Sequence, residues 1–250
     1  MKLKFLIKSW HYVALISLGV CFSYSDSYAQ DVDETTARGG LAIGAKIGVN
    51  LNQFSQPGTN IGTNVGGFAR YQILDFLDVQ GELVYSLEGG GRQEFYRDMY
   101  IGGYDGPISD IYYINRSIYL HNIEIPVSAR LTLPELNTGS IVPKFIVGGS
   151  YSFNLAAFES NDKVIYFNDG TSGLVSNTRE NVRGDYFPHN FSAHVGMALD
   201  FALTNGNVFT MEIRYRQGFN NLNQVSTIIS EITDKLHSAT LSINFSYRIF

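Results

Sequence analysis

Cysteine is almost absent from this sequence: the single cysteine among the 250 residues is Cys21, which lies in an N-terminal segment that we expect to be removed. A disulfide framework and thiolate chemistry are therefore excluded for the mature chain. No stretch approaches about 18 consecutive apolar residues, which excludes a transmembrane helix. The chain also has no basic cluster, and its net charge is −5, so nucleic acid is not an expected partner.

The first thirty residues have the pattern of a secretory signal peptide. Lysines provide a basic start, residues 13–22 form an apolar core, and Ser27–Ala29 resembles a cleavage site. We expect residues 1–29 to be the signal peptide, 30–39 a flexible periplasmic lead and 40–250 a single domain. A lipid anchor on Cys21 is the alternative, but Val20 stands where that processing needs a small residue.

Strict alternation of apolar and polar residues marks the end of the chain, Ser238–Phe250. A period of two predicts a β-strand with one apolar and one polar face. Similar alternation runs through seven further segments: 41–52, 64–72, 77–88, 118–132, 141–154, 191–201 and 208–216. Each has about the 9–11 residues that a tilted strand needs to cross hydrocarbon. We predict an all-β fold, an eight-stranded antiparallel up-and-down transmembrane β-barrel of the outer-membrane type.

The connections between these segments alternate in length. Short turns at 73–76, 133–140 and 204–207 alternate with a modest connection at 53–63 and longer ones at 89–117, 155–190 and 218–237. Short turns on one rim and long loops on the other are typical of outer-membrane barrels. An even strand number then places both termini on the short-turn, periplasmic rim, with the long loops extracellular.

A water-soluble barrel of the lipocalin type has the same alternation, with its apolar side inside. The loop pattern and the terminal aromatic favour the membrane, and we interpret Tyr247 and Phe250 as a signal to the barrel-assembly machinery. The 16 tyrosines and 17 phenylalanines suit the aromatic girdles of a membrane barrel. The expected location is the cell outer membrane, in contact with its lipid and lipopolysaccharide.

Charged residues concentrate on the polar side of the predicted strands. Eight strands enclose a space that side chains just fill, so we expect these charges to pair and plug the lumen. The predicted lumen charge network consists of Lys46, Arg70, Glu82, Glu88, Glu124, Arg130, Lys144, Asp200, Glu212, Arg214, Arg216 and Arg248. Pro126 removes one ladder hydrogen bond in mid-strand, and we predict a bulge or local bend there.

Several segments resemble a known family. They are Gly44–Leu51, Gln80–Ser86, Asn122–Pro126, Gly148–Tyr151 and Arg214–Gly218. In this order and spacing they resemble the PorT-like outer-membrane β-barrel domain over residues 40–250. The resemblance implies an eight-stranded barrel of Gram-negative envelopes, usually of unassigned role. The family provides no catalytic residues to transfer.

Candidate chemistry is sparse. His189 and His237 stand near Ser192 and Ser238, and a Ser-His-acid site at the outer rim would need them within hydrogen-bond reach. His121 is predicted to face outward and His194 to face the lumen. Neighbouring serine and histidine arise readily by chance, so we expect no catalytic residues and no cofactor. We expect no metal either, because 161–162 and 168–170 lack the spacing of a calcium loop.

A loop at 94–113 is rich in aromatic residues. They are Phe95, Tyr96, Tyr100, Tyr104, Tyr112 and Tyr113. Exposed aromatics suit contact with a partner, although these rings could equally pack on one another or lie at the lipid headgroups. The sequence thus favours a non-enzymatic structural or interaction barrel with an unknown envelope partner. The alternatives are a narrow transport pore and a lipid-modifying enzyme.

Overall fold

The computed structural model describes residues 40–56, 58–92, 95–98, 106–203, 206–224 and 235–249. The predicted signal peptide (1–29), the predicted lead (30–39) and Phe250 lie outside these residues, as do Tyr100 and Tyr104.

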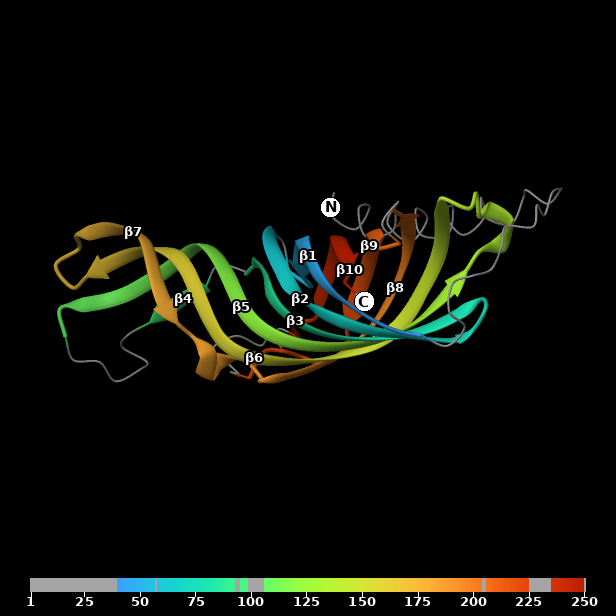
Figure 1. Ribbon diagram of the computed structural model, residues 1–250. Helices are drawn as coiled ribbons and strands as arrows, with labels where there is room; N and C mark the ends of the chain where they lie inside the picture. Colours follow the sequence, from blue (N-terminus) through green and yellow to red (C-terminus); the bar gives the residue numbers. More distant parts are fainter. Residues whose placement is uncertain are drawn as a thin grey trace. The chain divides into compact units, whose positions relative to one another are not determined.

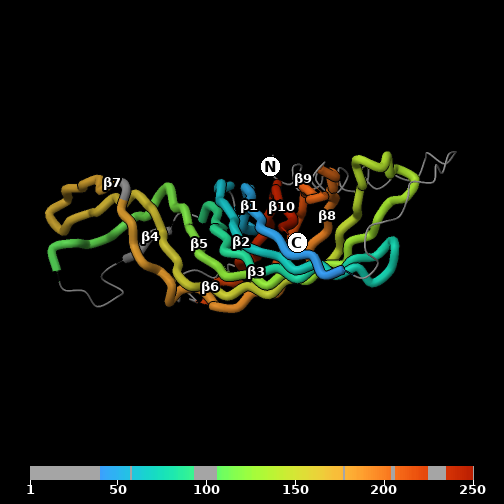
Figure 2. The backbone as a smooth tube through the Cα atoms, in the orientation of Figure 1, coloured from blue at the N-terminus to red at the C-terminus, as the bar shows by residue number. Residues whose placement is uncertain are grey.

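Eight strands form a closed antiparallel ring (Figures 1 and 2). They are β1 (Leu41–Phe54), β2 (Thr59–Leu74), β3 (Leu77–Gly91), β5 (Ile108–Thr132), β6 (Ile141–Phe167), β8 (His189–Ala202), β9 (Val208–Gly218) and β10 (Ser238–Arg248). Each strand of the ring pairs with the next along the chain, and β1 pairs with β10 to close it. Closure leaves no free edge in the ring, so its backbone groups are satisfied internally. The predicted fold class is confirmed.

Two further strands extend the sheet beyond the ring. The short β4 (Phe95–Asp98) pairs with the start of β5, and β7 (Ser172–Asn181) pairs with the end of β6. We call β4, β7, residues 108–117 of β5 and residues 155–167 of β6 the extension. In Figure 1 the green and yellow strands β5 and β6 run continuously from the ring into it.

The prediction of loops over 89–117 and 155–190 was therefore wrong for most of both segments. Register shifts at Ile114/Ser117 in the β5–β6 ladder and at Asn161/Lys163 in the β6–β7 ladder interrupt the alternation there. Asn115 takes a φ of 50° at the first of these shifts. A bulge inserts an unpaired residue and resets which face each side chain takes, so a sequence pattern of strict period two does not find such strands.

The two ends of the ring differ. Residues 75–76, 133–140 and 203–207 connect strands at the short-turn end, where Pro134–Leu136 forms the 3-10 helix η1. The remaining connections lie at the opposite, long-loop end, with the 3-10 helix η2 (Arg183–Asp185). Gly206 has a φ of 81°, which suits the predicted Asn-Gly hairpin turn, although Asn205 lies outside the described residues. Among the described helices, none is long and apolar enough to span a bilayer.

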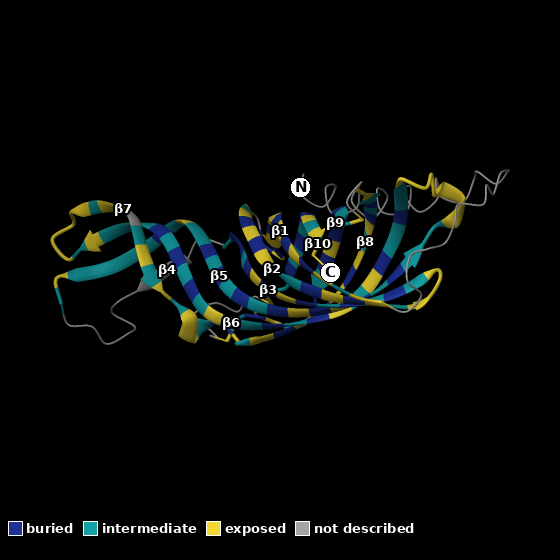
Figure 3. Cartoon of the chain, in the orientation of Figure 1, coloured by how far each residue is buried: buried dark blue, intermediate teal, exposed yellow. Residues whose placement is uncertain are grey.

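Burial alternates along the ring strands, with polar side chains inside and apolar ones outside (Figure 3). The exposed side chains between the two ends are mostly aliphatic and include Ile47, Val65, Leu83, Val127, Val147, Val195, Ile213 and Ile243. Aromatic side chains gather at the ends. Phe209 packs against Phe201 and Phe245 at the short-turn end, with both centroid separations 6.1 Å, and Tyr151 lies 5.3 Å from Phe191 towards the long-loop end.

The two aromatic groups are separated by about the thickness of a hydrocarbon layer. Phe191 and Phe201 both face outward on β8 and are ten residues apart. Ten steps of about 3.4 Å on a strand tilted by about 40° project to roughly 26 Å along the barrel axis. Outer-membrane barrels present an apolar band about 25 Å tall between aromatic girdles. The outer surface of this ring has those dimensions.

Pro126 disturbs the sheet less than predicted. The β3–β5 register is the same on both sides of it, from Gly81 opposite Val127 to Val84 opposite Glu124. The predicted bulge at Pro126 is therefore wrong. Instead, the pairs between these two positions are missing from the ladder, because proline has no N–H to donate. The nearest register shift lies at His121/Asn122, in the pairing with β6.

Candidate functional site

The lumen contains a continuous chain of ion pairs. At its centre, the Lys46 ammonium lies 2.9 Å from Glu82 and 3.1 Å from Glu212. Arg214 bridges the same two carboxylates, at 2.6 Å from Glu82 and 2.8 Å from Glu212. Four charges from β1, β3 and β9 thus neutralise one another where the strands bring their inward faces together.

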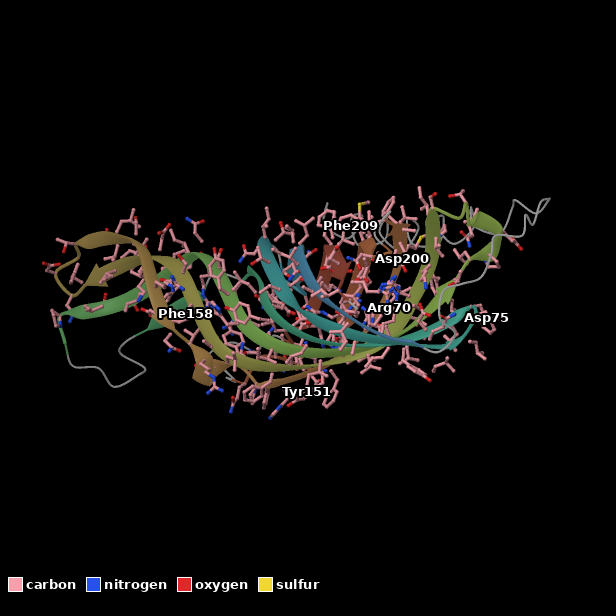
Figure 4. The ribbon with its side chains drawn as sticks, in the orientation of Figure 1. Arg70, Asp75, Tyr151, Phe158, Asp200 and Phe209 are labelled. Atoms are coloured by element: carbon pink, nitrogen blue, oxygen red, sulfur yellow. The ribbon has the colours of Figure 1, made fainter. Side chains whose placement is uncertain are left out.

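The chain of ion pairs continues towards the short-turn end through Arg130. Its guanidinium contacts Glu212 at 3.3 Å and Asp200 at 3.1 Å, and its side chain is only 1% exposed. Asp200 also accepts a hydrogen bond from Arg70 at 3.1 Å, and Figure 4 shows these two side chains in the ring interior. Lys144 lies 3.7 Å from Asp200 and 2.5 Å from Asp78, which ends the chain.

A second cluster lies nearer the long-loop end. Arg216 of β9 donates one N–H to Glu88 of β3 and another to Glu124 of β5. Both carboxylates are buried, at 3% and 4% exposure. One arginine therefore joins three strands across the lumen, and its removal would leave two carboxylates without a cation.

The structure brings together eleven of the twelve residues of the predicted lumen charge network, and it corrects the twelfth. Arg248 instead donates to the Gly206 carbonyl oxygen at 2.7 Å, at the exposed short-turn rim. Sequence reasoning missed Asp78, although its parity matches that of Gln80 and Glu82 on β3. With Asp78 included, the paired groups comprise six cations and six carboxylates, so their formal charges cancel.

Amide and hydroxyl groups fill the space around these ions. Asn64 donates to the side-chain oxygens of Asn50 at 2.7 Å and Asn244 at 2.9 Å. His194 faces the lumen as predicted, but its ring nitrogen Nε2 lies 2.9 Å from the Ser128 hydroxyl rather than near Asp200. These groups connect β1 to β2, β2 to β10 and β5 to β8 by hydrogen bonds inside the ring.

An apolar cluster covers the lumen at the long-loop end, and we call it the apolar cap. It consists of Phe54, Ile118, Leu120, Ala157, Tyr186, Leu222 and Leu236, with Val182 packed against it. Burial raises the pKa of Tyr186 to about 12, against the opposing effect of Arg92, which donates to the Tyr186 hydroxyl at 2.8 Å. Leu222 and Leu236 come from the two described ends of the β9–β10 connection, so these ends turn inward over the lumen.

A small cavity lies among the charged residues of the lumen. A cavity lined by Glu82, Glu124, Pro126, Arg214 and Arg216, among other residues, has a volume of about 30 Å³. A single water needs about 10–15 Å³ by this measure, so the cavity has room for about two waters. Sites for small organic ligands are far larger, at roughly 300–1,000 Å³.

The candidate catalytic pairs do not meet. Ser192 shares a hydrogen bond with Ser150 at 2.6 Å, and Ser238 accepts one from Asn190 at 3.1 Å, both inside the barrel. His189 is on the outer surface, where its Nδ1 lies 2.6 Å from the Tyr151 hydroxyl. His237 contacts Ser55 through its backbone N–H, at 3.2 Å. The serine and histidine residues that are close in sequence therefore do not hydrogen-bond to each other.

The outward position of His121 agrees with its predicted parity. Its Nδ1 lies 2.5 Å from the Tyr85 hydroxyl on the outside of the ring. The possible calcium segments are occupied by local hydrogen bonds: Asp169 accepts from Thr171, and Asn161 contacts Glu159 and Thr178. The described residues contain no cluster of three or more side chains of the types that usually ligate metals.

The predicted aromatic loop is mostly part of the extension. Tyr112 and Tyr113 lie in β5, and Phe95 and Tyr96 form half of β4. Tyr113 is 8% exposed, with the Lys163 ammonium 5.1 Å from its ring centroid, so this ring packs within the sheet. On the opposite face, Tyr112 aligns with Val164 and Leu174, and Leu174 is 65% exposed. An apolar row therefore crosses one face of the extension.

A closed ring of eight antiparallel strands, apolar outside and filled with paired charges inside, defines a transmembrane β-barrel of the outer-membrane type. The model of the family described as "Outer membrane protein beta-barrel domain" matches residues 28–224, which is more than half of the chain. The chain belongs to this family, and it is an outer-membrane protein. The matched segment ends before β10, the strand that closes the ring.

Solved structures of other outer-membrane proteins are similar to this chain. A major outer membrane protein from Thermus thermophilus has 8% identity and a TM-score of 0.45, with 83% of this chain and 98% of that chain covered. Neisserial surface protein A has 14% identity and a TM-score of 0.39, with 82% of this chain and 95% of that chain covered. The attachment invasion locus protein of Yersinia pestis has 14% identity and a TM-score of 0.36, with 83% of this chain and 97% of that chain covered. No property of these proteins is transferred to this chain. A search of curated proteins found no match.

Proposed function

We propose that this protein is a non-enzymatic structural or interaction barrel with a plugged lumen, which presents the extension to a partner outside the cell. In this orientation the short-turn end and both termini are periplasmic, and the long-loop end is extracellular. The observation that carries the proposal is the filled interior. Balanced ion pairs and the apolar cap fill the described part of the lumen, where the cavity beside Glu82 and Arg214 measures about 30 Å³, while the largest departure from a simple barrel is the extension.

The alternative of a narrow transport pore finds no support in this packing. A permeating ion would have to separate buried pairs such as Arg130–Asp200 and Arg216–Glu88, and stranding a buried charge costs about 3–5 kcal/mol. The alternative of a lipid-modifying enzyme finds none either, because the candidate serines face the lumen while His189 faces outward.

Planar-bilayer recordings test the plugged lumen. We expect the mature protein, inserted into planar bilayers, to show no steady conductance, because paired charges and the apolar cap block the path at two levels. A porin of known conductance added afterwards to the same bilayer is the positive control for detection. A stable open level from this protein, proportional to the number of inserted barrels, would instead establish the transport pore.

Site-specific crosslinking tests the extension. A photoreactive residue at Leu174, which is 65% exposed on the extension, should crosslink to a distinct envelope component in native outer membranes. The matched control is the same residue at Leu136, 46% exposed in η1 at the other end of the ring. If the products from Leu174 do not exceed those from Leu136, the extension is not a partner surface.

We also propose that the chain belongs to the PorT-like branch of the family. The support is the segment Asn122–Pro126, whose inward residues Asn122, Glu124 and Pro126 all face the lumen and whose proline lines the central cavity. A lumen-facing proline in a strand that keeps its register is a feature that other PorT-like barrels should share if the assignment is correct.

A further inference from the structure

An arginine-rich patch lies on the outer surface of β6, where the strand leaves the ring. The guanidinium carbon of Arg179 lies 4.5 Å from the ring centroid of Phe158. Phe158 contacts the edge of His121 at a centroid distance of 5.5 Å, and His121 is hydrogen-bonded to Tyr85. Four strands, β3, β5, β6 and β7, thus contribute to one outward row that ends in an exposed cation.

A second exposed arginine, Arg183 of η2, contacts the same stretch of β6. Arg183 donates to the backbone carbonyl oxygen of Asn154 at 3.2 Å. Three residues before Asn154 on β6, Tyr151 stacks on His189 with ring centroids 5.8 Å apart. Arg183 and Arg179 therefore contact β6 at positions 154 and 158, a separation of about 13 Å along a strand. We call Arg179, Arg183 and the rings of Phe158, His121 and Tyr151 the arginine–aromatic patch.

The charges of this patch are unlike those of the lumen. Inside the ring, every cation of the network has a carboxylate within 4 Å. Over the described part of the chain, no carboxylate forms an ion pair with Arg179 or Arg183, and both side chains are exposed. Two cations held in place by a ring and a carbonyl group, without anions of their own, are arranged to receive an anion from outside the protein.

The position of the arginine–aromatic patch relative to the membrane indicates which anion it binds. The aliphatic band that faces hydrocarbon ends at the aromatic group of Tyr151 and Phe191, and Phe158 lies seven residues farther along β6 towards the long-loop end. Aromatic girdles of membrane proteins lie at the headgroup level. In Figure 4, Tyr151 lies between Phe158, towards the long-loop end, and Asp75, at the short-turn end. The arginines therefore contact β6 beyond this aromatic group, on the side where the lipid headgroups lie.

We propose that the arginine–aromatic patch binds the phosphate groups of a glycolipid headgroup in the outer leaflet and so holds a lipid against β6. A planar guanidinium forms paired, charge-assisted hydrogen bonds to phosphate while its face stays on an aromatic ring. Two separate cations suit a headgroup with two separate phosphates. This inference rests on the proposed function, since it needs the long-loop end to face the outside.

Native mass spectrometry of the detergent-solubilised mature protein tests the proposal. The probes are lipid A with its phosphates, dephosphorylated lipid A and phosphatidylglycerol, with inorganic phosphate as competitor. We expect phosphorylated lipid A to bind at least tenfold more tightly than the dephosphorylated form. The double variant Arg179→Gln/Arg183→Gln should lose that preference, whereas Arg248→Gln, which removes an exposed arginine at the short-turn end, should retain it.

The outcomes are distinct. Equal binding of both forms of lipid A by the wild type, or an unchanged preference in the double variant, would overturn the proposal. Phosphatidylglycerol binding as tightly as lipid A would reject the outer-leaflet glycolipid as the ligand, and full competition by millimolar inorganic phosphate would assign the patch to free phosphate. Both arginines are exposed, so the double variant should fold, and its heat-dependent gel migration checks this. A conducting lumen would reject the proposed function without affecting this result.

Discussion

Replacing Glu212 with glutamine is expected to lower the free energy of unfolding by about 3–5 kcal/mol, the usual cost of removing one partner from buried ion pairs. Glu212 contacts Lys46, Arg130 and Arg214, and its side chain is 4% exposed. Glutamine preserves the shape but leaves the interior with an excess positive charge. Urea unfolding of the barrel folded into lipid vesicles measures the loss.

Two comparisons separate the charge effect from other causes. Glu135→Gln removes an exposed carboxylate in η1 and should change the free energy of unfolding by less than about 0.5 kcal/mol. Adding Lys46→Met to Glu212→Gln removes a cation with the anion, so the double variant should lose less than the sum of the single variants. Additive losses, or a loss from Glu212→Gln no greater than that from Glu135→Gln, would show that the network contributes little.

An arginine at position 243 is expected to cost about 2–4 kcal/mol, because Ile243 faces the hydrocarbon near the middle of the apolar band. Ile243 is 43% exposed, and its cross-strand neighbours Val49 and Ile213 are exposed as well. Neither of these two cross-strand neighbours offers a polar group to an arginine at this position. The same unfolding measurement in vesicles gives the cost.

The control for this prediction is the same substitution at a position nearer the membrane surface. Leu41→Arg places the same side chain on the outer face at the start of β1, next to the short-turn rim, where the cost should fall to about 0–1 kcal/mol. A soluble barrel would not distinguish the two positions by their distance from a membrane surface. Equal costs at 41 and 243 would therefore reject the lipid-facing assignment of the outer surface.

The ring itself was predictable because its strands keep a period of two over most of the length that crosses the membrane, even though Phe68, Val84 and Ile146 are apolar and buried. The same periodicity assigned the inward charges, since residues such as Lys46 and Glu82 share a parity with their polar neighbours. Arg248 shows the limit of that reasoning. Parity alone places it inside, but it stands at the rim, where a nearby carbonyl group competes for its guanidinium.

The apolar cap and the extension could not be predicted in this way. Leu222 and Leu236 lie in a connection without periodicity, and only the closed ring brings them over Phe54 and Ile118. The extension is hidden by its register shifts, and its β7 strand is too polar to stand out. Pairings such as Arg216 with Glu88, between β9 and β3, also depend on the closure of the ring rather than on any local pattern.

The unbroken course of β5 and β6 from the ring into the extension has a mechanical consequence. The two strands stay hydrogen-bonded from Ile108–Phe167 to Thr132–Lys144, so no loose tether separates the protruding platform from the lipid-embedded wall. A partner bound at Leu174 would exert force along β5 and β6. That force would be shared, in shear, by the long row of backbone hydrogen bonds between these two strands. We therefore expect the extension to move together with the barrel rather than independently of it.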